Sequence, residues 1–197
     1  MKKLFTRFTV IIFMLSCLSG LTGCIAAAVT GGVVVAGTLV YYHKRIQGYV
    51  SDKTIAFIAN NRLYGNKELY AENHIVIGVY NGTVLLVGQV SDEKYKQQAE
   101  DLVKNIDGVE RVYDEIVIGP NTSVWRQSKD DAITAQIKSK MLVQSNFDVS
   151  AVKVITEDSV VYLMGVVSPS QADMAINIAR DTAGVTKVVK VFQYINS

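Results

Sequence analysis

The sequence predicts an α+β fold built from two tandem copies of one αββαβ unit. The first observation behind this is an internal repeat, in which residues 83–91 match residues 160–168 and residues 99–109 match residues 175–185. The second is the order of local signals, which in both copies runs from a tight turn between apolar runs to a helix start and a last apolar strand. Each copy is therefore expected to pack two helices on a small mixed three-stranded sheet.

Turn and cap residues place the elements of the first copy. Asn81-Gly82 lies between two apolar runs, and this pair strongly favours a two-residue hairpin turn. Ser91 is expected to cap the helix that follows, and Gly108 to end it. The elements predicted in this copy are, in chain order, a helix over 54–63, strands over 75–80 and 83–90, a helix after residue 91 and a strand over 112–118.

The second copy repeats this order with clearer helix signals. A helix is predicted over Asp131–Met141, where apolar residues recur at helical spacing. Ser168 to Gln171 has the pattern of a capping box with proline at the first helical position. Gly184 is expected to end that second helix, and a strand over 185–195 follows. Because a strand–helix–strand connection crosses over with one hand, the strands that flank it are expected to pair in parallel.

These elements divide the chain into five segments. Residues 119–123 are rich in turn formers and mark the boundary between the copies. Each copy is long enough to bury one small hydrophobic core. The predicted segments are a signal peptide over 1–23, an apolar tether over 24–50, a first domain over 51–119, a linker over 120–128 and a second domain over 129–197.

The first 24 residues have the pattern of a secretory signal that ends in a cysteine. A basic start is followed by an apolar run over Phe8–Leu18 and then by Leu21-Thr22-Gly23-Cys24. This string resembles the lipobox of bacterial lipoproteins at all four positions. The resemblance implies cleavage before Cys24 and acylation of that residue, and an uncleaved signal anchor is the alternative. Ile25 follows the cysteine, and the absence of aspartate there implies the outer membrane, on its periplasmic face.

Processing at Cys24 would change both the charge and the thiol content of the chain. The full sequence carries a net charge of +2, and removal of Lys2, Lys3 and Arg7 leaves 17 basic against 18 acidic side chains, a net charge of −1. This balance gives no reason to expect nucleic acid as a partner. Cys17 would be lost, so no disulfide is expected. Residues 25–42 are uncharged and are interpreted as a tether on the membrane surface, with a flexible linker as the alternative.

The sequence contains no pattern that predicts catalysis. Its histidines are His43 and His74, and neither has a second ligand at metal-binding spacing. The paired carboxylates Asp92-Glu93 and Glu100-Asp101 fall on the polar side of a predicted helix, where a solvated surface is the simpler interpretation. We therefore expect a non-enzymatic protein without a metal, a cofactor or a small-molecule substrate.

Two strand ends carry a family resemblance. Val84–Gln89 and Tyr162–Gly165 both run from apolar residues to glycine, and a Gly-Val pair follows the helix in each copy. Together with the αββαβ order, these strings resemble the BON domain, and the whole chain resembles the dual-BON outer-membrane lipoproteins. The resemblance implies phospholipid binding by the second domain, around its first helix. The corresponding residues are Ile133, Thr134, Ile137, Lys138, Lys140, Met141 and Leu142.

The residues of this helix leave the lipid site open to two interpretations. Lys138 and Lys140 could meet lipid phosphates, and each would contribute about 1 kcal/mol near an anionic surface. The alternative is that the apolar members of the set form the core while both lysines are solvated. A member of the family has tryptophan where this chain has Ala132. Trp125, seven residues upstream in the predicted linker, is the candidate replacement, unless it packs between the domains.

These observations predict an outer-membrane lipoprotein that binds an anionic phospholipid membrane through its second domain and supports envelope integrity. The alternative is a protein-interaction adaptor that assists outer-membrane protein assembly through exposed strand edges. A polysaccharide-binding module is a third class, and it is disfavoured because most tyrosines occupy positions expected to pack a small core.

Overall fold

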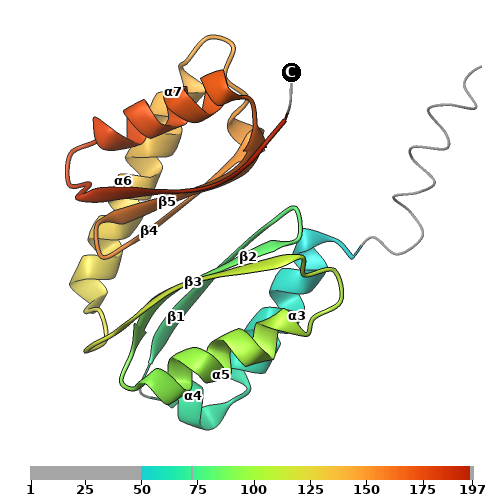
Figure 1. Cartoon of the computed structure of the whole chain (residues 1–197). Coiled ribbons are helices and arrows are strands. Elements are labelled where there is room, and N and C mark those ends of the chain that lie inside the picture. The colour runs from blue at the N-terminus through green and yellow to red at the C-terminus, as the bar shows by residue number, and fades with distance from the viewer. Residues whose placement is uncertain (1–49, 72, 196–197) are drawn as a thin grey trace, which may run out of the picture. The chain divides into compact units, whose positions relative to one another are not determined.

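The computed structural model describes residues 50–71 and 73–195 (Figure 1). The predicted signal peptide, Cys24 and the predicted apolar tether up to residue 49 lie outside these residues. These described residues form one compact unit. The elements are α3 (Asp52–Tyr64), α4 (Lys67–Ala71), β1 (His74–Tyr80), β2 (Thr83–Val90), α5 (Glu93–Lys104), β3 (Arg111–Ile118), α6 (Val124–Leu142), the 3₁₀ turn η2 (Val149–Ala151), β4 (Val152–Glu157), β5 (Val160–Val167), α7 (Pro169–Arg180) and β6 (Lys187–Tyr194).

Two small mixed sheets confirm the predicted α+β fold. Their strand orders are β1-β2-β3 and β4-β5-β6. In each sheet the first two strands form an antiparallel hairpin, and the last strand pairs with the middle one in parallel, as the strand–helix–strand connection predicts. None of the helices in the described part of the chain is long and apolar enough to cross a bilayer.

Each hairpin turn is held by a carboxylate from the first helix of its own domain. The Asn81 and Gly82 backbone N–H groups donate to Asp52 at 2.7 and 3.0 Å. In the second domain, the N–H groups of residues 158 and 159 donate to Asp130 at 2.8 and 2.9 Å. Both turns have positive φ at their two central residues, as the twist of a tight hairpin requires. This repeated contact fixes each first helix against its hairpin.

A glycine at the end of each middle strand allows two strands to approach closely. A Cβ on Gly88 would lie 2.0 Å from the His74 carbonyl oxygen, and one on Gly165 would lie 2.2 Å from the Ala151 carbonyl oxygen. Gly88 also has a φ of +127°, which L side chains rarely adopt. The glycine in each of the two strand segments that resemble the BON domain is therefore required by packing.

Three apolar clusters hold the described residues together. The helices of each domain lie on one face of its sheet, α3 and α5 on the first and α6 and α7 on the second (Figure 1). Beneath them lie one core per domain, which includes Ile55, Leu86 and Ile116 in the first and Ile137, Leu163 and Ala175 in the second. The opposite faces of the two sheets share a third cluster, formed by Leu85, Val87, Tyr162, Met164 and Val191.

A polar contact joins the first strands of the two hairpins beside this third cluster. His74 Nε2 lies 3.3 Å from Glu157 Oε2, and the Gln89 side chain donates to Glu157 Oε1 at 3.0 Å. The bond to Glu157 raises the pKa of His74 above 6.5. Burial works to raise the pKa of Glu157, but the bonds from His74 and Gln89 outweigh it and hold that pKa below 4.5. His74 thus has a structural partner, and its role in the fold is to join β1 to β4.

The helix ends differ from the sequence prediction in three respects. α6 begins at Val124 instead of Asp131, because Ser123 accepts from the Arg126 N–H and caps the helix seven residues earlier. Asp92 rather than Ser91 caps α5. α5 and α7 end before the predicted glycines, and Gly108 and Gly184 instead occupy turns at φ of +88° and +91°. The glycines are thus needed for the turns that start the last strands.

Candidate functional site

The candidate site is α6, the helix that carries most of the residues predicted to bind lipid. Its inner face belongs to the core of the second domain. Ile133, Ile137 and Met141 are buried there against β4, β5 and α7. In this fold these three side chains present no surface to a membrane, which corrects their assignment as direct lipid contacts. They position the helix instead.

Two more of the predicted residues are engaged within the domain. The half-buried Thr134 hydroxyl bonds the Thr156 hydroxyl at 2.7 Å, which ties α6 to β4. Lys140 is exposed, but its Nζ donates to the Asp181 carbonyl and the Thr182 hydroxyl, each at 3.0 Å. Lys140 therefore joins the end of α6 to the end of α7. Its charge still lies at the surface and contributes to the local potential.

Exposed apolar residues occupy both ends of α6. Trp125 is 72% exposed in the first turn, and Leu142 is 69% exposed in the last. Val124 and Val143 are still more exposed beside them. Val124 and Leu142 are eighteen positions apart, which is five full turns at 3.6 residues per turn. They therefore lie on the same side of the helix, about 27 Å apart along its axis. Sequence reasoning had placed Trp125 in the linker and had missed both valines.

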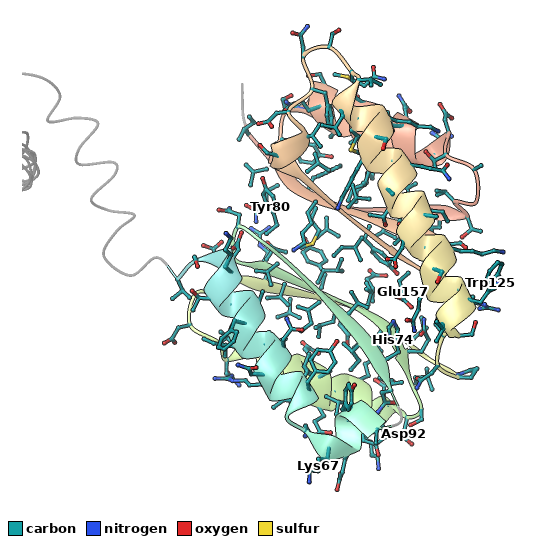
Figure 2. The ribbon with its side chains drawn as sticks, turned by 180° about the vertical axis from the view of Figure 1, so that it is seen from behind. Lys67, His74, Tyr80, Asp92, Trp125 and Glu157 are labelled. Atoms are coloured by element: carbon teal, nitrogen blue, oxygen red, sulfur yellow. The ribbon has the colours of Figure 1, made fainter. Side chains whose placement is uncertain are left out.

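The Trp125 ring is held at the start of α6 by its surroundings. Figure 2 shows its side chain standing away from the helix. Lys129 Nζ lies 5.9 Å from the ring centroid, on the next turn of α6. Arg126 forms an ion pair with Asp158 at 2.8 Å, which links this first turn to the β4–β5 hairpin. The aromatic ring is therefore presented at a defined place on the surface. It does not pack into the core.

Lys138 lies on the same outer side of α6 and borders a hollow of about 440 Å³. Lys53 of α3 and Lys153 of β4 line the same hollow, and Asp52 is the acidic residue in it. Burial lowers the pKa of Lys153, and the nearby positive charge of Lys138 lowers it further, although Asp52 acts in the opposite direction. This part of the surface is therefore electropositive and suits an anionic group.

The residues that the structure describes contain no candidate metal site. No group of three histidine, cysteine, aspartate or glutamate side chains within residues 50–71 and 73–195 lies close enough to hold a metal ion. Asp130, the most buried carboxylate of α6, is used by the hairpin turn, and burial raises its pKa although the two turn N–H groups act against this. The chemistry available at α6 is therefore contact between apolar and positively charged side chains and another surface.

The fold is that of a protein with two tandem α+β domains, and comparison with known proteins places it in a family. The BON domain model matches residues 51–120 and again residues 129–196. The chain is 40% identical over 177 residues to the outer membrane lipoprotein DolP of Haemophilus influenzae, across 89% of this chain and 91% of that protein. It is 39% identical over 146 residues to a 21 kDa hemolysin of Actinobacillus pleuropneumoniae, across 74% of this chain and 75% of that one.

Two further similarities are more limited. The osmotically-inducible protein Y of Escherichia coli is 35% identical over 108 residues, which are 53% of this chain and 54% of that protein. The C-terminal domain of CdsD, a structural protein of the Chlamydia trachomatis type III secretion system, aligns with a TM-score of 0.29 at 13% identity, across 69% of this chain and 96% of that one.

The chain belongs to the BON-domain family. Within it, the chain is a dual-BON protein of the DolP type, an outer-membrane lipoprotein with an envelope-associated role. This confirms the family resemblance and the outer-membrane localisation predicted from the sequence.

Proposed function

We propose that this lipoprotein binds anionic phospholipid through the outer face of α6 and thereby supports outer-membrane integrity. The observation that carries the proposal is the division of α6 into two faces. One face is buried in the core, while the other exposes Trp125 and Leu142 at its two ends with lysines on its surface. Lys138 lies one turn from Leu142 on the same side of the helix, and exposed apolar side chains beside cations are features of a helix that lies on an anionic membrane.

The energies expected of these groups are small. Each lysine near an anionic surface contributes about 1 kcal/mol, and an exposed Trp or Leu side chain contributes about 1–2 kcal/mol when it leaves water. Such a helix alone binds a membrane weakly. The acylated Cys24 that the lipobox implies would hold the chain at the bilayer, so that a weak contact becomes effectively intramolecular. α6 would then select the lipid, and the acyl chains would supply the affinity.

The test uses the mature-length chain with Cys24→Ser, so that no acyl anchor masks the weak contact. Flotation with phosphatidylglycerol-containing vesicles is compared with flotation on purely zwitterionic vesicles, at low and at physiological salt. We expect salt-sensitive binding to the anionic vesicles only. The double variant Lys138→Glu, Lys140→Glu should weaken it by about tenfold or more, because each reversal removes an attraction and adds a repulsion. Unchanged binding of this variant would show that the electrostatic part is wrong.

A second candidate function is that of an adaptor for outer-membrane protein assembly. It is supported by the edge strands of the two sheets, β1, β3, β4 and β6, each of which pairs on one side only within its sheet. The end of β3 exposes Val117 and Ile118, so a partner strand could extend the first sheet there. Crosslinking in cells from Val117 separates the two functions. An adaptor gives a discrete protein adduct at this edge, whereas a lipid-binding protein does not need one.

A further inference from the structure

A second electropositive surface lies at the far edge of the second domain, away from the elements that α6 contacts most. It is a hollow of about 360 Å³ between α7 and β6, and it is lined by the cations Arg180, Lys187 and Lys190 over apolar side chains. α6 packs mainly on β4, whereas α7 packs on β5 and β6. The hollow is therefore a separate site from the proposed lipid-binding face.

The fold places Arg180 and Lys190 on two sides of this hollow, and Lys187 lines it from the start of β6. Arg180 is the last residue of α7, and Lys187 is the first residue of β6. Side chains alternate along a strand, so Lys190 leaves β6 on the same face as Val188 and Phe192, which pack against the second core. This is the face that α7 covers. Lys190 therefore reaches the hollow from the sheet side while Arg180 reaches it from the helix side.

Among the residues that the structure describes, the three cations have no acidic partner. The ion pairs within residues 50–71 and 73–195 involve His74, Lys104 and Arg126, so no carboxylate lies within 4.0 Å of Arg180, Lys187 or Lys190. None of their side chains makes a hydrogen bond within the same residues. A cation in the last turn of a helix is favoured by the helix dipole, which accounts for Arg180. It does not account for the two lysines on the strand.

The first domain offers an internal reference for the same place. α5 and β3 correspond to α7 and β6 with an offset of 76 residues. Lys104 stands where the second domain has Arg180, but it is neutralised by an ion pair with Asp101, whose counterpart is Asn177. Asp114 stands in place of Lys190.

At two further positions that line the hollow, the first domain is acidic and the second is uncharged. Glu100 and Glu110 stand where the second domain has Ile176 and Thr186. Lys187 corresponds to Arg111, the one position at which both domains have an unpaired cation. The first domain thus holds three carboxylates and two cations at the positions that line the hollow, whereas the second holds three cations and no carboxylate. The two copies share the order of their elements, and the second has no acidic side chain at these positions.

We propose that the hollow formed by Arg180, Lys187 and Lys190 binds a phosphate group. A guanidinium fork and two ammonium groups around an apolar floor match the charge and the several acceptor oxygens of a phosphate. The phosphate could belong to a soluble ligand or to a lipid head group, and both use the same contacts. The site is independent of the α6 proposal, because none of its three cations lies on α6.

The test uses the full lipoprotein in micelles of dodecyl maltoside, a detergent without phosphate. Binding of glycerol 3-phosphate is measured by titration calorimetry. The triple variant Arg180→Gln, Lys187→Gln, Lys190→Gln should bind about tenfold more weakly or not at all, because charge-assisted hydrogen bonds are lost. Lys190→Asp, which copies the first domain at one position, should weaken binding with the least disturbance of the surface. Circular dichroism verifies that each variant is folded.

The matched control is the double variant Lys104→Gln, Arg111→Gln, which removes the two cations at the corresponding place of the first domain. It should bind glycerol 3-phosphate as the native chain does. The proposal is overturned if the native chain does not bind glycerol 3-phosphate, if the triple variant binds as tightly as the native chain, or if the control loses as much. Repeating the native titration in micelles that contain phosphatidylglycerol then identifies the source. Weaker binding indicates that the lipid head group occupies the site, and unchanged binding indicates a soluble ligand.

Discussion

The two domains of this chain share their interior and differ in their surface. Both clamp a hairpin turn with a carboxylate from the first helix, Asp52 in one and Asp130 in the other. Both place a glycine where a neighbouring carbonyl leaves no room for a Cβ. The second domain, however, extends its first helix to 19 residues against 13, and exposes apolar residues at both of its ends. The fold is therefore common to both copies, and the candidate binding features belong to one.

Among substitutions in the interior that the two domains share, those of the closely packed glycines should lower the free energy of unfolding most. Gly88→Ala places a Cβ 2.0 Å from a carbonyl oxygen at a φ of +127°, so we expect a loss of about 4 kcal/mol in the free energy of unfolding. Gly165→Ala should lose less, because it meets the close contact without a positive φ. Urea unfolding measures both. Gly119→Ala is the control, since nothing lies within 4 Å of its Cβ, and its stability should match the native chain.

Replacing the two carboxylates that hold the hairpin turns should destabilise the chain more where the carboxylate is more deeply buried. Asp130 is 4% exposed and Asp52 is half-buried. Asp130→Ala leaves two turn N–H groups without their acceptor and should lower the free energy of unfolding by about 2–3 kcal/mol, while Asp52→Ala should cost about 1–2 kcal/mol. Thermal unfolding of the two variants tests this order. Equal and negligible losses would mean that the turns hold themselves and that the clamp is incidental.

Truncation of exposed apolar side chains on the first helix of each domain tests whether membrane binding belongs to the second domain alone. Trp125→Ala combined with Leu142→Ala should weaken binding of the Cys24→Ser chain to phosphatidylglycerol vesicles by about tenfold or more, since about 2 kcal/mol of apolar contact is removed. Phe57→Ala is the control, because Phe57 is 67% exposed on α3, the corresponding helix of the first domain. A similar loss from Phe57→Ala would mean that exposed apolar residues act without regard to the domain that carries them.

The contact between His74 and Glu157 should give the smallest effect, and it depends on pH. The pKa of His74 is raised, so its contribution is present below its unfolded pKa of 6.5 and is lost as the pH rises through the folded value. The pKa of Glu157 is lowered, so its contribution is present above its unfolded pKa of 4.5 and is lost as the pH falls through the folded value. The pair therefore stabilises most between about pH 4.5 and 6.5. His74→Gln should lower the melting temperature within this range and remove part of its fall above pH 6.5, and an unchanged profile would contradict the role assigned to the pair.

The sequence predicted the repeat, the strand order and the parallel crossovers, because turn and cap residues act locally. It did not predict the start of α6, since Ser123 and Asp131 are both acceptable signals and tertiary packing decides between them. Helical spacing alone does separate Leu142 from Ile137, because it places Leu142 on the side opposite Ile133, and Leu142 is exposed whereas Ile137 is buried. The Asp130 clamp and the unpaired cations at β6 depend on contacts between residues distant in the chain, which no local pattern records.

Trp125 is the single tryptophan of the chain, so its fluorescence reports directly on the outer face of α6. The measurement is its emission from the Cys24→Ser chain, with phosphatidylglycerol vesicles and with zwitterionic vesicles, each with and without brominated acyl chains. If α6 contacts lipid, the emission shifts to shorter wavelength and is quenched by bromine on the anionic vesicles only. Unshifted and unquenched emission from protein that floats with those vesicles would contradict the account, because binding would then occur through another surface.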